Sequence, residues 1–475
     1  MDSAVIEEIK GIAGEENCTT KTADLYVYGF DASVHHENPD IVVMPKTTEQ
    51  VSKIVKVANR HKIPILARGA GTGLCGHAVP LKKGIVLDMC KMNNIKEVQV
   101  EDLYCVVEPG VIYAKLNKEL AKKNFFFPPT PGSGDVCTIG GMVAVNASGM
   151  RAIKYGATRD YVLGLEVVLP NGEIMETGTR TLKNSSGYQL DRLFVGSEGT
   201  LGVITKINLR VAPLPKARAL ALVAFDDLVK AGQCVSNLIA HPLIPSAIEI
   251  IDNVCIKAVN NAMKVGFPDV EAMLLVEVDG HPNVVEEEIK LVSEICEKSG
   301  AVNVEFSTDK DTMAKWIAGR KAVLPSLSRY GEKFVSVSLA DDMAVPMSQI
   351  PKAVKAFQEI AKKNNVIVGT YGHAADGNLH TKMLLDPKSK KYWENGEKAV
   401  KGIFDAVLEL GGTVTGEHGV AISKAPYMQT ERSSALATMK AIKSALDPNN
   451  IMNPGKMMDW EGSIISNLRY EVEKE

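Results

Sequence analysis

Two histidines flank an Asp-Gly pair in the segment from Val366 to Asp386. Apolar β-forming residues lie on both sides of Asp376-Gly377, which predicts a β-hairpin closed by a two-residue type I′ turn. This turn would pair His373 directly with His380, at a separation of about 5 Å between their Cβ atoms. Two imidazoles at that separation predict that both histidines bind one metal ion.

A Glu-His pair between glycines supplies the other candidate groups of this site. Glu417 and His418 end a short β-like run, where neighbouring glycines leave both side chains free to project. Glu417 would complete a metal site with His373 and His380, leaving one coordination position for a substrate oxygen, while His418 would act as a base. Zinc suits these ligands best, and manganese or iron would also accept them. Ordinary polar loop residues are the alternative, but three of the nine histidines in two glycine-rich loops favour a site.

The composition indicates an ordinary globular chain. With 475 residues it exceeds what one core usually supports, so two or three domains are expected. The net charge of -3 and the scattered lysines give no reason to expect nucleic acid or an anionic membrane surface as a partner. The N-terminus has neither a basic start nor an apolar run long enough for a signal peptide or a transmembrane segment, so we expect a cytoplasmic protein.

The segment from Arg68 to His77 contains the dinucleotide-binding pattern GxGxxG at Gly71, Gly73 and Gly76. That pattern indicates a Rossmann turn only when a helix follows, and here Pro80 and a second predicted strand follow instead. A loop between two strands presents a run of bare backbone amides. Such amides suit a phosphate when no helix N-terminus is available.

A second glycine-rich loop, from Pro128 to Gly134, is rigid at its prolines and open at its glycines. Two such loops suit a diphosphate. Small residues from Thr138 to Gly149 would let a large flat group pack against the backbone, and the segments Lys154 to Tyr161 and Gly196 to Thr205 add further turns that lead into strands. Each stretch is weak alone, because glycine-rich turns commonly only connect strands.

Together these stretches resemble the vanillyl-alcohol-oxidase-type FAD enzymes, in the branch of glycolate oxidase catalytic subunits, D-lactate dehydrogenases and D-2-hydroxyglutarate dehydrogenases. The resemblance implies an α+β fold, with a bipartite FAD-binding domain and an α+β cap domain that has an antiparallel sheet. The expected domains are 1–214 for FAD, 215–420 for the cap and 421–475 for a segment that returns to the FAD domain. The matching motifs are Arg68 to Gly73, Pro128 to Ser133, Thr138 to Asn146, Tyr155 to Leu165, Gly196 to Thr205, His373 to His380, Gly416 to Gly419 and Leu446 to Lys456.

The resemblance also implies that FAD is the cofactor, with its diphosphate on the loops 68–76 and 132–141. His77 lies near the first loop and leaves a covalent flavin link open, although we expect noncovalent FAD. The residues expected to bind FAD are Arg68, Gly69, Gly71, Thr72, Gly73, Pro131, Gly132, Ser133, Thr138, Gly140, Gly141, Asn146, Ser148, Gly149, Tyr155, Gly156, Glu198, Gly199, Val203 and Asn453.

Arg320 matches an arginine that this family uses for the substrate carboxylate. A guanidinium binds a carboxylate through two parallel hydrogen bonds, as a 2-hydroxy acid substrate requires. Without the resemblance, a solvated charge on a helix would be the better interpretation of Arg320. Arg329 and Lys333 are weaker candidates for the same role.

The expected reaction is FAD-dependent oxidation of a small D-2-hydroxy acid, D-lactate or glycolate, to the 2-oxo acid. The eight cysteines include no Cys-x-x-Cys pair, so electrons should pass to a separate protein, such as an electron-transferring flavoprotein or an iron–sulfur subunit. Three alternatives stay open: D-2-hydroxyglutarate oxidation, which needs a second cation for the distal carboxylate, a zinc hydrolase with structural glycine loops, and a flavin-binding subunit without chemistry.

Overall fold

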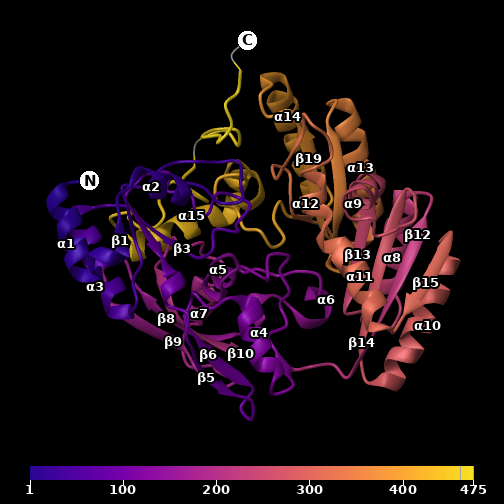
Figure 1. The fold of residues 1–475 in the computed structure, drawn as a ribbon, viewed down its shortest axis with the longest axis horizontal. Helices are drawn as coiled ribbons and strands as arrows, with labels where there is room; N and C mark the ends of the chain where they lie inside the picture. Colours follow the sequence, from indigo (N-terminus) through magenta and orange to yellow (C-terminus); the bar gives the residue numbers. More distant parts are fainter. Residues whose placement is uncertain (461, 474–475) are drawn as a thin grey trace. The chain divides into compact units, whose positions relative to one another are not determined.

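The computed structural model describes residues 1–460 and 462–473, and its contacts divide the chain into two compact units (Figure 1). Unit 1 comprises Met1–Ser148, Ala157–Leu214 and Glu417–Arg469. Unit 2 comprises Gly149–Gly156, Pro215–Gly416 and the C-terminal residues from Tyr470. The sequence placed the domain boundaries after residues 214 and 420. It did not predict that the segment Gly149–Gly156 and the residues from Tyr470 belong to unit 2.

Unit 1 contains a four-stranded sheet in the order β1-β2-β4-β3. The last three strands are parallel, and β3 and β4 are joined without a helix, as the loop from Arg68 onward predicted. Thr47 caps the helix that follows β2, because its side chain accepts a hydrogen bond from Gln50 N at 3.2 Å. The elements are α1 (Ser3–Ala13), β1 (Cys18–Thr19), α2 (Thr22–Tyr28), β2 (Ile41–Val43), α3 (Thr48–His61), β3 (Ile65–Arg68) and β4 (Ile85–Asp88).

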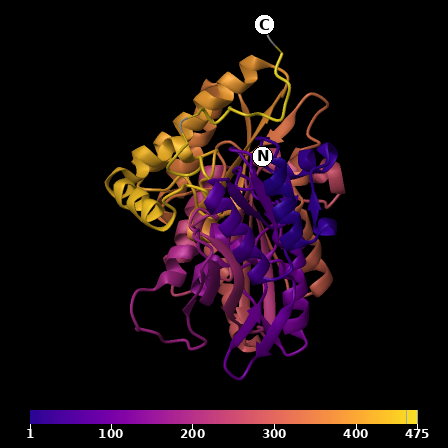
Figure 2. The same ribbon diagram turned by 90° about the vertical axis from the view of Figure 1, so that its left-hand side faces the viewer.

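A second sheet of unit 1 is antiparallel and has the order β5-β6-β10-β8-β9. Residues of α4, α5 and α7 share one buried apolar cluster with this sheet. The C-terminal helix α15 adds partly buried side chains to the same cluster. This helix belongs to the yellow part of the ribbon in Figure 2. The elements are β5 (Ile95–Gln99), β6 (Tyr104–Val107), α4 (Tyr113–Ala121), α5 (Ile139–Val145), β8 (Val162–Val168), β9 (Ile174–Gly178), α7 (Leu190–Phe194), β10 (Val203–Arg210) and α15 (Met428–Leu446).

Unit 2 is built on one antiparallel sheet in the order β15-β12-β14-β13-β18-β19-β16, with β17 beside β19. Helices α9, α11 and α12 share a buried apolar cluster with the face of the sheet that carries Tyr371. The α+β class and the antiparallel cap sheet are therefore confirmed. The strands are β12 (Ala217–Phe225), β13 (Ala247–Asp252), β14 (Ala272–Gly280), β15 (Asn303–Ser307), β16 (Val335–Val337), β17 (Met343–Ala344), β18 (Ile367–His373) and β19 (Asn378–Leu385); the helices are α8 (Leu228–Ile239), α9 (Asn253–Met263), α10 (Pro282–Lys298), α11 (Lys310–Lys321), α12 (Val323–Leu327), α13 (Ile350–Lys363) and α14 (Lys390–Glu409).

The hairpin β18–β19 forms, but its predicted register is wrong. His373 pairs with Asn378, and His380 pairs with Tyr371. The type I′ turn needs positive φ at two residues, whereas here only Gly377 has one, at 79°, and the three residues before it form a helical turn. The loop is therefore four residues long. Because the change moves the pairing by an even number of residues, both histidines stay on one face of the sheet.

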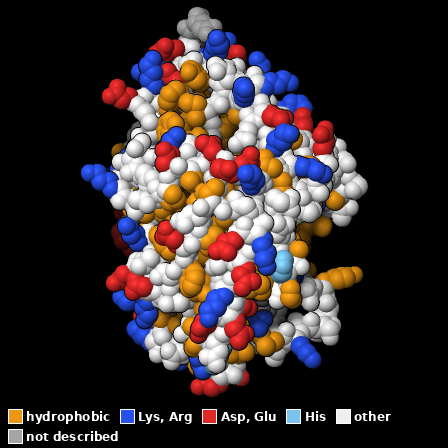
Figure 3. Space-filling model, turned by 90° about the vertical axis from the view of Figure 1, so that its right-hand side faces the viewer, with side chains coloured by type: hydrophobic (Ala, Val, Ile, Leu, Met, Phe, Trp, Pro, Cys, Tyr) orange, Lys and Arg blue, Asp and Glu red, His pale blue; other side chains and the backbone are white. Residues whose placement is uncertain are grey.

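One face of the molecule carries charges of both signs. On the face drawn in Figure 3, positive and negative side chains are interspersed with hydrophobic ones. This agrees with the small net charge of the sequence. In the described part of the chain, no helix combines the length and the apolar character that crossing a bilayer requires.

Candidate functional site

Both predicted metal histidines lie in the hairpin of unit 2, close to buried carboxylates. Their ring centroids are 5.2 Å apart. Nδ1 of His373 lies 2.6 Å from Oε1 of Glu249, its direct cross-strand partner on β13. Nδ1 of His380 lies 3.4 Å from Oδ1 of Asp341, which precedes β17. Sequence reasoning missed both carboxylates, because nothing local to either one marks it as a neighbour of a histidine.

Arg320 is buried on α11, so it is not the solvated helix charge that composition alone would suggest. Its Nη2 lies 2.5 Å from Oε2 of Glu249, and its guanidinium lies 4.7 Å from the centroid of the Tyr371 ring. Burial by itself would raise the pKa of Glu249, but Arg320 and His373 outweigh it and lower that pKa below its ordinary value. The Nε atom of Arg320 is buried and has no hydrogen-bond partner among the described residues, so it can still donate a hydrogen bond to a ligand carboxylate.

Arg329 and Lys333, the weaker candidates, are exposed. A different cation lies near the histidines: Lys382, which is buried on β19 and contacts Asp341 and Ser338. Lys382 follows His380 by two residues, so the predicted strand already placed both side chains on the same face of the sheet. The two buried cations of the region, Arg320 and Lys382, thus each have a buried carboxylate as a partner.

Four side chains offer ligand atoms that lie within 4.8 Å of one another: Asp342, His380, Glu417 and His418. Two carboxylates and two imidazoles are the donors that zinc, manganese or iron accepts. The group contains His380 and Glu417 of the predicted ligand set, lacks His373, and adds Asp342 and His418. The sequence assigned His418 to the base and did not single out Asp342.

Hydrogen bonds fix Asp342 where the chain reaches Glu417. Its carboxylate accepts from Asn378 Nδ2 and from Thr415 Oγ1, both at 2.9 Å. Its backbone oxygen accepts from Gly416 N at 2.8 Å. Asp342 has a φ of 72°, an unusual value for a residue with a side chain. Strain of this kind indicates that surrounding contacts hold the residue in place.

In unit 1, the first glycine-rich loop lies against the start of α5, which follows the second loop in the chain. A Cβ atom on Gly69 would be 2.2 Å from Oγ1 of Thr138, and a Cβ atom on Gly140 would be 2.5 Å from Pro109. Thr138 also caps α5 by accepting a hydrogen bond from Gly141 N at 3.2 Å. Around a Cβ atom on Gly132, by contrast, there is open space within 4 Å. Close backbone packing beside open glycine backbone fits a diphosphate, which binds to bare amides.

Glu198 connects the turn before β10 with the C-terminal part of unit 1. Its carboxylate accepts hydrogen bonds from Val420 N at 2.7 Å and from Ala421 N at 2.8 Å. Its backbone oxygen accepts from Asn453 Nδ2 at 2.8 Å. Glu198 and Asn453, both predicted cofactor residues, are therefore brought together. Since both backbone amides follow closely on His418, Glu198 also fixes the loop that carries this histidine.

His77 and Lys456 lie against Glu198 and were not among the predicted cofactor residues. Nε2 of His77 is 3.3 Å from Oε2 of Glu198, and Lys456 Nζ donates to the backbone oxygen of His77 at 2.5 Å. Burial lowers the pKa of Lys456 to about 7, against the attraction of Asp31 and Glu198. The signal that the sequence offered was the Asn453-Pro454-Gly455 turn directly before Lys456.

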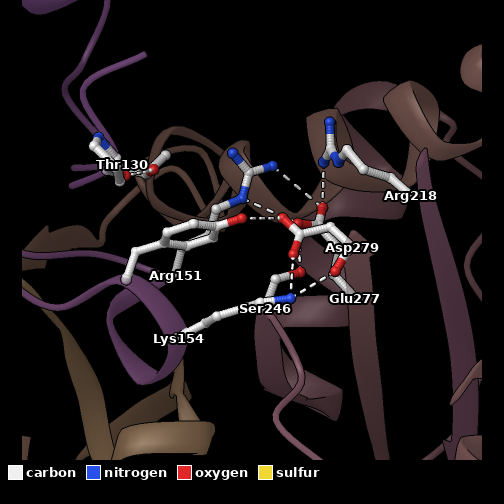
Figure 4. A network of polar contacts seen from close by, with 9 residues as sticks. Thr130, Arg151, Lys154, Arg218, Ser246, Glu277 and Asp279 are labelled. Carbon is white, nitrogen blue, oxygen red and sulfur yellow. Dashed lines mark hydrogen bonds and ion pairs between the residues drawn. The ribbon is translucent and has the colours of Figure 1, made fainter. Parts of the chain in front are cut away.

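Three predicted cofactor residues, Gly149, Tyr155 and Gly156, lie in a segment that is anchored to β14 of unit 2 (Figure 4). Tyr155 Oη and Lys154 Nζ donate to the Asp279 carboxylate at 2.8 and 2.6 Å. Arg151 and Arg218 pair with Glu277 two residues earlier on the strand. The remaining predicted cofactor residues lie in unit 1: Arg68, Gly69, Gly71, Thr72, Gly73, Pro131, Gly132, Ser133, Thr138, Gly140, Gly141, Asn146, Ser148, Glu198, Gly199, Val203 and Asn453.

Two family models match this chain. The family described as FAD linked oxidases, C-terminal domain, matches residues 214–457, and the FAD binding domain family matches residues 39–178. The glycolate oxidase subunit GlcD of Bacillus subtilis is 40% identical over 95% of this chain and 96% of its own length. A mitochondrial D-lactate dehydrogenase of Arabidopsis thaliana is 35% identical over 96% of this chain and 80% of its own.

Solved structures show the same fold at low sequence identity. p-Cresol methylhydroxylase has a TM-score of 0.80 at 19% identity, covering 97% of each chain. The 4-ethylphenol oxidase of Gulosibacter chungangensis has a TM-score of 0.77, also at 19% identity, covering 96% of this chain and 97% of its own. The vanillyl-alcohol-oxidase type of FAD fold, expected from the sequence motifs, is thereby confirmed.

Proposed function

This chain belongs to the FAD-linked oxidases, and from that premise we propose that it oxidises a small D-2-hydroxy acid, D-lactate or glycolate, to the 2-oxo acid. The observation that carries the proposal is the buried Arg320 of α11, whose contacts Glu249 and Tyr371 lie on the sheet face that also carries the two histidines. The names of the relatives, a glycolate oxidase subunit and D-lactate dehydrogenases, support this class of substrate. Membership of the family leaves no ground for the metal-dependent hydrolase.

In the proposed reaction each group has one task. Arg320 binds the substrate carboxylate, for which a buried guanidinium with an open Nε is suited. His418 takes the proton of the substrate hydroxyl as a general base. Bound FAD would supply the acceptor for the hydride of Cα, and a bound divalent ion would supply the charge that lowers the pKa of the hydroxyl. His380 and Glu417 would hold that ion, with His373 as the third ligand and zinc as the expected metal.

Electrons then leave to a separate protein, an electron-transferring flavoprotein or an iron–sulfur subunit. The sequence supports this proposal, since it contains neither an iron–sulfur spacing nor a nicotinamide-type Rossmann unit. The purified protein should therefore reduce artificial dyes but not NAD. Steady-state reduction of NAD by this chain alone would contradict the proposal.

D-2-Hydroxyglutarate is the weaker candidate, because its second carboxylate needs a second cation. Arg329 and Lys333 are exposed, and the buried Lys382 is already paired with Asp341. Binding a second carboxylate at Lys382 would mean breaking a buried ion pair, which costs several kcal/mol, on the order of 3 to 5. This observation favours a substrate with one carboxylate.

Anaerobic titration of the yellow protein tests the proposal. D-Lactate or glycolate should bleach the visible flavin absorbance, while D-2-hydroxyglutarate should be much less effective. Arg320→Lys should keep FAD and raise KM by about 10- to 100-fold, the value of one lost charge-assisted hydrogen bond. Arg60→Lys is the control, because Arg60 pairs with Glu8 on the surface. A protein that none of the hydroxy acids bleaches would refute the proposed function.

A further inference from the structure

Each histidine of the hairpin lies at one end of a buried row of three side chains, with a carboxylate in the middle and a cation at the other end. In the first row, Arg320 lies 2.5 Å from Glu249, and Glu249 lies 2.6 Å from Nδ1 of His373. In the second row, Lys382 contacts Asp341, and Asp341 lies 3.4 Å from Nδ1 of His380. Both rows thus present a carboxylate to the same ring nitrogen, Nδ1, and a cation to the other side of that carboxylate.

This arrangement selects one form of each imidazole. A carboxylate only accepts hydrogen bonds, so Nδ1 of His373, which is hydrogen-bonded to Glu249, carries the proton. Nδ1 of His380 makes no hydrogen bond to Asp341 at 3.4 Å, and there the negative charge favours a proton on Nδ1 by electrostatic attraction alone. In a neutral imidazole with a proton on Nδ1, the lone pair is on Nε2. A buried carboxylate on one nitrogen and a metal ion on the other is the arrangement by which proteins orient histidine ligands.

We propose that Glu249 and Asp341 are positioning residues that make His373 and His380 present Nε2 to one divalent cation. The inference deepens the proposed function and rests on its metal site. His373 is outside the group formed by Asp342, His380, Glu417 and His418, whose ligand atoms lie within 4.8 Å of one another. The proposal includes His373 in the metal site because Glu249 orients its ring. The histidines are on one sheet face with rings 5.2 Å apart, so both can turn toward the same ion.

The rows also assign structural tasks to the two cations. Arg320 and Lys382 hold the carboxylates by electrostatic attraction inside a region where an unpaired charge would be costly. Arg320 is therefore shared between Glu249 and the proposed substrate carboxylate. Replacing Glu249 would disturb both partners of Arg320, and the test must separate metal affinity from substrate affinity.

The zinc dissociation constant of the metal-stripped, FAD-loaded protein is the measurement, obtained by competition with a chromophoric chelator. Glu249→Gln and Asp341→Asn should each weaken zinc binding by about 10- to 100-fold, as loss of an outer-shell partner of a ligand histidine does. Because a lone buried Arg320 could harm folding, Glu249→Leu combined with Arg320→Met removes carboxylate and cation together. This double variant should bind zinc at least as weakly as Glu249→Gln.

Glu277→Gln is the matched control. Glu277 is as buried as Glu249, with 1% exposure each, lies in the same sheet, and has Arg151, Arg218 and Ser246 as its partners. Its replacement should leave the zinc affinity within about threefold of the wild type, well inside the effect expected of an outer-shell partner. Flavin absorbance measured on each variant reports whether the FAD site is intact.

One result would overturn the inference. Wild-type zinc affinity in Glu249→Gln, Asp341→Asn and the double variant would show that the carboxylates do not orient the ligands, even if activity were lost. The proposed function fails differently: His380→Ala with full zinc affinity, or a wild type that binds no zinc, would refute the metal site itself. Loss of zinc in His380→Ala with retention in the carboxylate variants would leave the site standing and refute only the positioning role.

Discussion

The segment Gly149–Gly156 should come loose from unit 2 when Asp279 is replaced by alanine. The Asp279 side chain is 1% exposed and binds Lys154 Nζ at 2.6 Å and Tyr155 Oη at 2.8 Å. Hydrogen bonds to a charged group contribute about 1.5 to 3 kcal/mol each. Lys154 is 27% exposed and regains some water after the change, so we take the low end, about 3 kcal/mol for the two bonds.

Limited proteolysis with trypsin measures this opening, because Arg151 and Lys154 are cleavage sites inside the segment. A loss of about 3 kcal/mol raises the open fraction by about 100-fold, since every 1.4 kcal/mol is a factor of ten. Cleavage should rise by a similar factor where opening is fast relative to cleavage. FAD retention should also fall, because Tyr155 and Gly156 are predicted cofactor residues.

Asp226→Ala is the control for this experiment. Asp226 pairs with Lys230 at 3.0 Å, but both side chains are more than half exposed, and such surface pairs contribute at most about 1 kcal/mol. Cleavage after Arg151 and Lys154 should not change in this variant. The reasoning is refuted if Asp279→Ala is cleaved there at the wild-type rate, or if all tryptic sites accelerate equally, which would indicate global unfolding.

Three further predictions concern the hairpin, the base and one buried lysine. Gly377→Val should destabilise the protein by about 3 kcal/mol, measured by urea unfolding. The left-handed backbone at this position costs a residue with a side chain about 1 to 2 kcal/mol. A Cβ atom would also lie 1.9 Å from the Val345 oxygen and displace the hydrogen bond between Val345 N and the Gly377 oxygen, worth about 1 kcal/mol. Wild-type stability would mean that the loop is built differently. His418→Asn should keep FAD and zinc while slowing flavin reduction by roughly 10²- to 10⁴-fold in stopped flow, and zinc loss would instead make His418 a ligand. Burial lowers the pKa of Lys456 to about 7, so above that pH the unfolded chain binds a proton that the folded chain lacks, and stability rises with pH from about 7 toward the unfolded pKa near 10. The melting temperature of Lys456→Met should lack this rise, and an unchanged pH profile would contradict the assignment.

The sequence by itself determined the features that depend on neighbouring residues. The strand after the loop that begins at Arg68 was predicted because Pro80 and apolar β-formers exclude a helix there, and β4 begins at Ile85. The helix capped by Thr47 was predicted from the cap and the apolar spacing that follows. The common face of His373 and His380 was also determined, because a change of register by two residues preserves the side of a strand.

The tertiary structure decided which groups surround those residues. The turn register depended on the conformation of the three residues before Gly377, which an Asp-Gly pair does not fix. Glu249 meets His373 across 124 residues because β13 pairs with β18, and no local pattern encodes that pairing. The attachment of Gly149–Gly156 to β14 likewise depends on charges 125 residues away. Local propensity and turn chemistry act over a few residues, whereas the partners of buried charges are set by strand order, which only the folded sheet determines.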